Sequence, residues 1–323
     1  MQNPIEQFRA ALVARAIVPP DSLLADGGLH RCDAEGKGGK GDAAYILHLD
    51  GLPAGGFENH RDGLGWQTWR ASGPDNPLTP SERAALAAKI EAARIRRQRE
   101  DARRRKQARE TAALVYADLP DCTRGDLHPY LLAKGIQPVR GVRVLADAGH
   151  RPDGLAGALL IVPMRDAAGA LHSLQYIDAA GQKRFLSGGR KQGCYFALGG
   201  APAGVLCIAE GLATGASVNE ATGHAVAVAF DAGNLQAAAV ALRRKFPCLT
   251  LVLCADNDRG TPGNPGLTKA RAAAAAVGGI VALPVFDAGA PAGASDFNDL
   301  HQLHGLGAVR AQIDRALIGG TAS

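Results

Sequence analysis

The sequence predicts an α/β protein whose C-terminal part is a parallel sheet with helices on both faces. From Val205 onward, short apolar runs alternate with helical segments, which is the rhythm of βαβ units. The residues before this point have two other patterns: short β-like runs separated by Asp-Gly turns near the N-terminus, and a mixed α+β segment after a long polar helix. We therefore expect an α/β domain preceded by a mixed subdomain and a small β-rich module.

Composition sets the limits of the interpretation. The chain has 323 residues, of which 46% are hydrophobic and 21% charged, and this excludes a largely disordered protein. The net charge of +5 is too small to name a partner. The six cysteines are scattered without a C-x-x-C pair, so neither a disulfide framework nor a cysteine-based zinc ribbon is indicated. The N-terminus lacks the apolar stretch of a signal peptide or membrane span, and we expect a cytoplasmic protein without a membrane partner.

The first module is expected to comprise residues 1–78. A helix over 4–17 is followed by β-like runs at 45–49, 54–59 and 66–70, and the Asp-Gly pairs between them favour hairpins. Zinc is not expected here, because the candidate ligands do not form the paired set of a zinc site. These candidates are His30, Cys32, His48 and His60.

Two tryptophans in this module are candidates for DNA binding. Trp66 and Trp69 are three residues apart, so in a strand they face opposite sides. One of them is then free to stack on a base beside Arg61 or Arg70, while the other packs in the core. Burial of both tryptophans in the core is the alternative.

Residues 79–115 predict a long helix. Thr79 and Pro80 are typical of a helix start. Between Arg83 and Arg109 there are eleven Lys or Arg and only three acids. The half from Arg96 to Arg109 has almost no apolar face, so we do not expect it to pack along its whole length. The helix is either a solvated connector or an arm that contacts DNA phosphates through Arg103, Arg104 and Arg105.

The remaining chain divides into three expected segments. Residues 116–202 predict a mixed α+β subdomain, residues 203–300 the α/β domain, and residues 301–323 a C-terminal helix or tail. Within the α/β domain, strands are expected at 205–209, 225–230, 249–255 and 280–286, with helices between them.

Acidic residues follow these strands where a parallel sheet places its ligand site. Glu210 follows the first strand, Asp256 and Asp258 follow the third, and Asp296 and Asp299 come after the last. Carboxylates gathered in one crevice are compatible with Mg²⁺ or Mn²⁺, and such a site suits phosphoryl transfer. A single acid at a strand end is more often a cap or loop residue, but the combination favours a metal site.

The sequences A-E-G at 209–211 and A-D-N-D at 255–258 resemble those of the Toprim domain shared by bacterial-type primases, topoisomerases and some nucleases. This resemblance implies a catalytic role for Glu210 and Mg²⁺ binding by Asp256 and Asp258. The segment at 296–300 is similar to one that follows the metal site in bacterial primases, which implies a further site acid at Asp299. Thr214 departs from the pattern, since many bacterial primases have Asp there. The stretch 210–217, E-G-L-A-T-G-A-S, resembles the primases of plasmids, conjugative elements and satellite phages.

Motifs between residues 131 and 196 are similar to the first half of the bacterial primase core. A basic residue near the polymerase site is part of that pattern, and Arg184 aligns best with it, with Lys183 beside it. Together with Lys191, they would hold triphosphate or template phosphates; a solvated hairpin is the alternative for Lys183 and Arg184. The module 1–78 resembles the degenerate zinc-ribbon region of mobile-element primases.

The resemblance implies a DNA primase that makes short RNA primers on single-stranded DNA. The expected catalytic residues are Glu210, Asp256, Asp258, Arg184 and Lys183, and the substrates are ribonucleoside triphosphates. Because the chain ends soon after Leu317, a separate helicase is the expected partner. A Toprim nuclease and a non-catalytic DNA-binding accessory protein are the alternatives.

Overall fold

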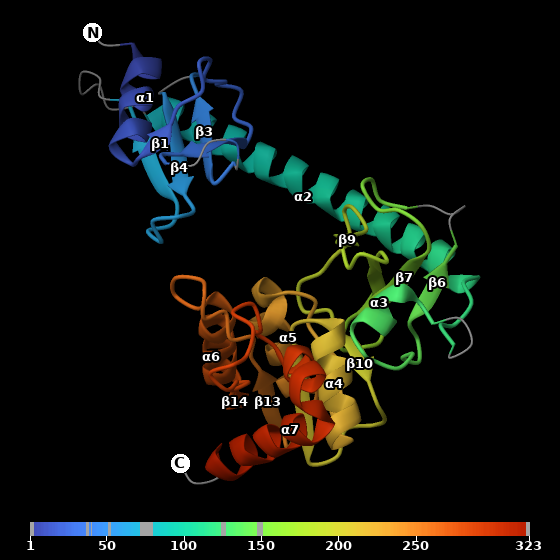
Figure 1. Ribbon diagram of the computed structural model, residues 1–323. Coiled ribbons are helices and arrows are strands. Elements are labelled where there is room, and N and C mark those ends of the chain that lie inside the picture. Colours follow the sequence, from blue (N-terminus) through green and yellow to red (C-terminus); the bar gives the residue numbers. More distant parts are fainter. Residues whose placement is uncertain are drawn as a thin grey trace. The chain divides into compact units, whose positions relative to one another are not determined.

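The computed structural model describes residues 3–36, 39, 41–50, 53–71, 80–123, 127–146 and 151–320 (Figure 1). The chain forms two compact units that divide between Ile90 and Glu91, inside helix α2 (Pro80–Ala117). None of the helices in the described ranges is both long enough and apolar enough to cross a membrane.

The first unit is built on a five-stranded antiparallel sheet in the order β1-β2-β3-β4-β5. The strands are β1 (Ile17–Val18), β2 (His30–Ala34), β3 (Ala43–His48), β4 (Ala54–Asn59) and β5 (Gln67–Arg70). Helix α1 (Pro4–Ala14) buries Phe8 and Leu12 against this sheet. The predicted meander is confirmed at β3 to β5, whereas β1 and β2 were not predicted. Gly55 is required at its position, because a Cβ atom there would lie 2.3 Å from the carbonyl oxygen of Ile46.

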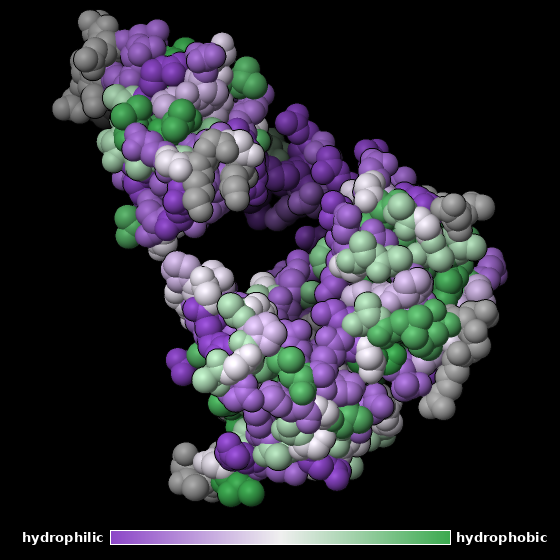
Figure 2. Space-filling view, in the orientation of Figure 1, coloured by the Kyte–Doolittle hydropathy of each residue, from purple (hydrophilic) through white to green (hydrophobic). Residues whose placement is uncertain are grey.

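Helix α2 confirms the predicted long helix, and its expected cap at Thr79 lies outside the described residues. Figure 2 shows a hydrophilic surface along the middle of this helix, where residues 91–107 are exposed. Ala108 and Ala112, one turn apart, are buried in a core with Leu159, Leu174 and other residues of the next sheet. The last turns of α2 are therefore anchored to the second unit, and the exposed stretch precedes them.

The second unit contains two sheets. The first is antiparallel, in the order β6-β7-β8-β9. Its strands are β6 (Arg143–Leu145), β7 (Leu159–Arg165), β8 (Leu171–Ile177) and β9 (Lys183–Phe185), and the short helix α3 (Pro129–Ala133) precedes them. These elements agree with the mixed α+β pattern expected for residues 116–202; β6 and β9 are too short to give a periodic signal.

The second sheet has the order β10-β12-β11-β13-β14. Its strands are β10 (Phe196–Leu198), β11 (Val205–Ala209), β12 (Ala225–Val228), β13 (Thr250–Cys254) and β14 (Ile280–Ala282). All neighbouring pairs are parallel except β10 with β12. Strand β14 is shorter than expected, and Pro284, which has no N–H to donate, follows it.

Helices cover both faces of this parallel sheet, as predicted. They are α4 (Leu212–Thr222), α5 (Ala232–Lys245), α6 (Pro265–Val277) and α7 (Phe297–Gly320), the last interrupted at Gly305. Within β11, Cys207 and Ala209 face the core that contains α4 and α7 residues, whereas Leu206 and Ile208 face α5 and α6. This alternation follows from the two-residue repeat of a strand.

The two sheets of the second unit share one hydrophobic core. Val162 and Met164 of β7 belong to the same buried cluster as Cys207 of β11 and Val252 of β13. Strand β10, which lies within the segment 116–202 of the sequence interpretation, hydrogen-bonds to β12 of the following segment. A bridge between Arg165 at the end of β7 and Tyr195, directly before β10, fixes the antiparallel sheet next to this edge strand of the parallel sheet.

Candidate active site

The crevice lies at the carboxyl end of the parallel sheet, beside β11. Strand β11 lies between β12 and β13 in the sheet, so the chain continues from β11 to the neighbour on one side and then crosses to the neighbour on the other side. Such a switch in strand order opens a crevice outside the strand ends. Ala209 pairs with Cys254 in the register of β11 and β13. Glu210 and Asp256, which follow these strands, consequently leave the sheet at the same edge.

Asp256 is the most perturbed acid of the crevice. Burial, followed by the negative charges of Glu210, Asp296 and Asp258, raises the pKa of Asp256 to about 8, although the positive charge of Lys183 acts in the opposite direction. Its Oδ1 atom is buried and accepts no hydrogen bond from any residue that the structure describes. A buried, unpartnered carboxylate oxygen is costly, and a bound cation would remove that cost.

Glu210 faces the same crevice. Burial raises the pKa of Glu210, and the nearby charges of Asp231 and Asp258 add to this effect, while a hydrogen bond from the backbone N–H of Ala232 opposes it. Asp258 is held by its loop, since its Oδ2 accepts a hydrogen bond of 3.0 Å from the backbone N–H of Gly266. These electrostatic effects place Glu210, Asp256 and Asp258 in one interacting group.

Asp296 and Asp299 have different surroundings. Oδ1 of Asp296 accepts hydrogen bonds of 2.8 Å from the backbone N–H groups of Asn298 and Asp299, so it caps the start of α7. Its Oδ2 accepts a hydrogen bond of 2.9 Å from Thr214, and its charge acts on Asp256. Oδ2 of Asp299 accepts from the N–H groups of Ser295 and Asp296. Asp296 thus borders the crevice, whereas Asp299 reaches back along its own helix start.

The structure brings Lys183, rather than Arg184, to the acids. Lys183 is exposed over the residue as a whole. Its ammonium nevertheless lies beside the backbone that follows Glu210, because a Cβ atom added to Gly211 would be 3.8 Å from Nζ. Burial and the charge of Lys134 lower the pKa of Lys183, and the charges of the crevice acids oppose this. Arg184 is on the other side of β9, where its guanidinium is near Gly154 and donates to the carbonyl of Lys183. Adjacent residues of a strand point to opposite faces, so only one of the two can enter the crevice.

Asp231 and Lys134 were not predicted as site residues. Asp231 accepts a hydrogen bond from Lys191, and its charge acts on Glu210. The ammonium of Lys191 also lies 5.0 Å from the ring centroid of Phe185. Asp231 directly follows the apolar run at 225–230, so the strand-end rule that identified Glu210 could have found it.

The first unit contains the candidates for template contact in the N-terminal module. Trp69 packs against Phe8 with ring centroids 4.9 Å apart, while Trp66 is 42% exposed. This confirms the prediction that the two tryptophans face opposite sides. Arg61 donates to the carbonyl of Glu35 at 2.8 Å and pairs with Asp42. Arg70 is exposed.

The histidines and cysteine considered as zinc ligands have local partners. His30 lies 2.7 Å from Asp26, and His60 lies 3.5 Å from Glu58. Burial raises the pKa of the Cys32 thiol to about 11, which opposes formation of the thiolate that a metal needs. Across the described parts of the chain, no three His, Cys, Asp or Glu side chains are arranged as a ready-made metal site.

The crevice residues nevertheless fit a hard divalent cation. Carboxylate oxygens are the ligands that Mg²⁺ and Mn²⁺ prefer. Burial, and after it the neighbouring acids, raise the pKa values of Asp256 and Glu210, and one oxygen of Asp256 has no partner among the described residues, so additional positive charge would stabilise the ionised acids. Glu210, Asp256 and Asp258 are the residues whose oxygens are suited to hold the ion.

Comparison with known proteins agrees with this geometry. Residues 205–307 match the Toprim domain family, and this range begins at β11 and includes all the crevice acids. The match identifies the α/β part of the chain as a Toprim domain.

Two curated relatives from Escherichia coli, both named DNA primase TraC, are 39% identical to this chain over 305 residues. The alignments cover 89% and 88% of this chain but only 27% and 20% of the relatives. The chain therefore spans about a quarter of the length of the curated relatives that it matches. The similarity is to proteins that are named DNA primases.

Solved primases are also similar in structure. The catalytic domain of DnaG primase bound to ssDNA is 13% identical, with a TM-score of 0.43, covering 68% of this chain and 83% of that one. The Aquifex aeolicus primase, with zinc-binding and RNA polymerase domains, is 14% identical, with a TM-score of 0.44, covering 98% and 86%. The primase fragment of the bacteriophage T7 primase-helicase is 16% identical, with a TM-score of 0.41, covering 61% and 80%.

Proposed function

We propose that this chain, whose residues 205–307 form a Toprim domain, is a DNA primase of plasmid type that joins ribonucleoside triphosphates into short primers on single-stranded DNA. The observation that carries the proposal is the crevice in which Glu210, Asp256 and Asp258 interact with one another and with Lys183. The 39% identity to curated DNA primases supports it.

The acids would hold Mg²⁺ or Mn²⁺, with Glu210, Asp256 and Asp258 as ligands and Asp296 at the border. A bound divalent cation supplies charge neutralisation for the reacting phosphate and lowers the pKa of the attacking hydroxyl. Asp299 was expected among the ligands, and in our proposal it acts by fixing the start of α7. Zinc has no role in the proposed reaction.

The cations around the crevice would bind the triphosphate. The charge of Lys183 acts on both Glu210 and Asp256, and its ammonium would donate to the phosphate oxygens as negative charge shifts during transfer. Lys191, now paired with Asp231, and Lys134 extend this positive rim. Arg184, on the far side of β9, would contact the template rather than the triphosphate.

Template binding would use surfaces outside the crevice. Trp66 has an exposed ring suited to stacking on a base, with Arg70 and Arg61 in the same module. The exposed cations of α2, including Arg103, Arg104 and Arg105, suit phosphate contacts. A replicative helicase as partner and a cytoplasmic location complete the proposal.

The test is primer synthesis. Wild type and the Asp256→Ala variant would each be incubated with single-stranded DNA, labelled ribonucleotides and Mg²⁺ or Mn²⁺. We expect short labelled products from wild type and none from Asp256→Ala. Asp314→Ala, which removes an exposed acid of α7, serves as control and should retain activity. Cleavage of the DNA without synthesis would instead indicate a nuclease, and binding without either reaction an accessory protein.

A further inference from the structure

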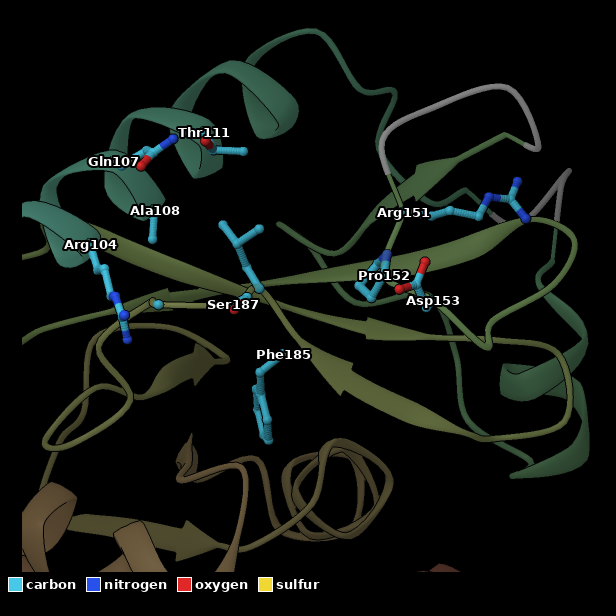
Figure 3. A pocket seen from close by; sticks show the side chains of 11 residues that line it. Arg104, Gln107, Ala108, Thr111, Arg151, Pro152, Asp153, Phe185 and Ser187 are labelled. Atoms are coloured by element: carbon cyan, nitrogen blue, oxygen red, sulfur yellow. The ribbon is translucent and has the colours of Figure 1, made fainter. Parts of the chain in front are cut away.

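A pocket of about 570 Å³ lies between helix α2 and the antiparallel sheet, apart from the metal crevice. Four residues of α2, three of the loop before β7, and four at and after β9 line it (Figure 3). Its volume is in the range of pockets that hold a small ligand. The segment of β9 connects it to the active site, since Lys183 at the start of this strand faces the acids and residues 186–188, directly after the strand, line the pocket.

Arg104 is the cation of this pocket. Figure 3 shows its side chain extending from α2 toward the strand side of the pocket, whereas the guanidinium of Arg151, at the other end, is directed away. No hydrogen bond or ion pair joins the Arg104 guanidinium to another residue in the described part of the chain. An arginine fork without a protein partner is suited to a phosphate group.

The packing of α2 fixes which arginine enters the pocket. Successive helix residues are rotated by about 100°. Ala108, buried beneath the helix, is one turn from Arg104, so Arg104 flanks the packed face. Gly188 supports the same placement, because a Cβ atom there would be 3.3 Å from the carbonyl oxygen of Arg104. Arg103 is rotated toward solvent, and Arg105 lies on the other flank.

The remaining lining suits the other parts of a nucleotide. Pro152, Leu186 and Ala108 provide apolar surface for a base. Gln107 and Ser187 provide side chains that hydrogen-bond to a sugar or base. Asp153 is at the end away from Arg104 in Figure 3. Its carboxylate would repel a phosphate but would accept a hydrogen bond from the amino group of a base. The phosphate is therefore expected at the Arg104 end.

We propose that this pocket binds one nucleotide of the single-stranded DNA template, with its phosphate on Arg104 and its base against Pro152 and Leu186. The proposal rests on the proposed primase function, because that function requires a single-stranded DNA template. It distinguishes Arg104 from the other arginines of the same helix, which would make only general electrostatic contacts.

The test compares three variants that remove the same charge. Binding of a fluorescently labelled oligodeoxycytidylate to the full chain would be measured by anisotropy, without metal or ribonucleotides, over a range of salt concentrations. We expect Arg104→Ala to weaken binding about tenfold, and Arg103→Ala and Arg105→Ala about twofold. Loss of a specific phosphate contact should also lower the salt slope by about 0.7 for Arg104→Ala. Arg104→Lys should restore part of the affinity.

A second pair of variants fills the pocket without changing charge. Gln107→Trp places a large ring in the pocket, and Gln98→Trp places the same ring on the solvent side of α2, half a turn away in rotation. The first should weaken oligonucleotide binding several-fold and the second should not. Circular dichroism and thermal melting would check that each variant is folded.

Equal losses for Arg103→Ala and Arg104→Ala, with equal salt slopes, would overturn the pocket assignment while leaving primer synthesis by wild type as separate support for the primase. A free nucleotide carries the same phosphate and base groups as a template nucleotide and is the other ligand that this pocket could bind. If binding of ATP alone depends on Arg104 and binding of the oligonucleotide does not, the pocket is a mononucleotide site and the template proposal is wrong. If wild type makes no primers and binds no oligonucleotide, the proposed function itself fails.

Discussion

The hydroxyl of Thr214 donates a hydrogen bond of 2.9 Å to Oδ2 of Asp296, and Thr214 is only 2% exposed. The other oxygen of Asp296 caps helix α7. Thr214 therefore fixes a crevice acid from α4 while the backbone fixes it from α7. Many bacterial primases have an acid in place of Thr214, according to the sequence resemblance, so this chain has one carboxylate fewer and a neutral donor instead.

Thr214→Val should show what the hydrogen bond from Thr214 to Asp296 contributes to stability and to primer synthesis. Valine has a similar shape but leaves Oδ2 of the half-buried Asp296 without its donor, and the cost should lie at or below the about 1 to 3 kcal/mol of a fully buried unpaired acceptor. We expect unfolding in urea at a lower midpoint, together with a lower rate of primer synthesis. Thr222→Val removes a buried hydroxyl at the other end of α4, which bonds to the carbonyl of Val218. That control should be destabilised to a similar degree without the specific loss of synthesis.

The position of the acids could be predicted from the sequence because it depends on element order alone. Glu210 and Asp256 follow apolar runs, and the carboxyl ends of parallel strands meet at one edge. Which acids face the crevice could not be predicted. The D-x-x-D pattern of Asp296 and Asp299 is compatible with both metal ligands and a helix cap, and only the backbone geometry of α7 shows that both contribute to capping.

The roles of Lys183 and Arg184 depend on strand register. A shift of one residue exchanges the two faces of a strand, and β9 has three residues, too few for the sequence to define its pairing. The anchoring of α2 was missed for a similar reason. Its contact face contains the small residues Ala108 and Ala112, and alanines give little amphipathic signal among so many arginines.

Lys183→Ala and Arg184→Ala test the two faces of β9. Both remove one positive charge from adjacent positions, but only Lys183 faces the acids. We expect Lys183→Ala to reduce the rate of nucleotide incorporation on the order of 100-fold, which is typical for a lost phosphate-stabilising group. Arg184→Ala should have a much smaller effect on the rate and should act on template affinity. Equal rate losses would contradict the assignment of Lys183 to the crevice.

Metal binding should be coupled to proton release. Since the pKa of Asp256 is raised to about 8 in the metal-free protein, this carboxyl is largely protonated at pH 7 and must lose its proton to bind a cation. Affinity for Mn²⁺ should therefore increase with pH up to about 8. Calorimetry in buffers of different ionisation enthalpy would measure the released protons. A pH-independent affinity between pH 6 and pH 8 would show that another group dominates.

The same raised pKa predicts that Asp256→Asn stabilises the metal-free protein. In the unfolded chain the carboxyl ionises near pH 3.8, whereas in the fold it ionises at about pH 8. Unfolding between these values releases a proton, so the contribution of Asp256 to stability becomes less favourable as pH rises through this window. The melting temperature of Asp256→Asn should exceed that of wild type at pH 8, and added Mg²⁺ should raise it less. The control Asp314→Asn should follow wild type.

Gly189→Ala should disturb the loop between β9 and β10 for steric reasons. A Cβ atom at Gly189 would be 2.1 Å from Oγ of the buried Ser173 and 2.5 Å from its Cβ. Overpacking of this kind costs about 1 to 3 kcal/mol, and the loop carries Lys191 to its place beside Asp231. The control is Gly200→Ala, where a Cβ atom would meet nothing within 4 Å. Urea unfolding should show a lower midpoint for Gly189→Ala and little change for the control.

Asp166 should make the second unit sensitive to acid. Burial alone would raise the pKa of Asp166, but the nearby His172 and the backbone N–H groups of Ala170 and Ala168 outweigh it, and the pKa falls to about 2. The His172 ring nitrogen lies 2.7 Å from the carboxylate. Because the pKa of Asp166 is lower in the fold than its value of 3.8 in the unfolded chain, the ionised carboxylate stabilises the fold at pH values above 3.8. This stabilisation is lost as the pH falls toward 2.

The measurement is the urea midpoint of wild type and Asp166→Asn at pH 6 and at about pH 3. As the pH falls, the free energy of unfolding of wild type should decrease on the order of 1 to 2 kcal/mol because of Asp166, since a shift of one pKa unit corresponds to about 1.4 kcal/mol. Asp166→Asn should be less stable at pH 6 and should show a smaller further loss on acidification. Since Asp314 is exposed, Asp314→Asn should keep the pH dependence of wild type. If Asp166→Asn also keeps it, the acid sensitivity arises from other carboxylates.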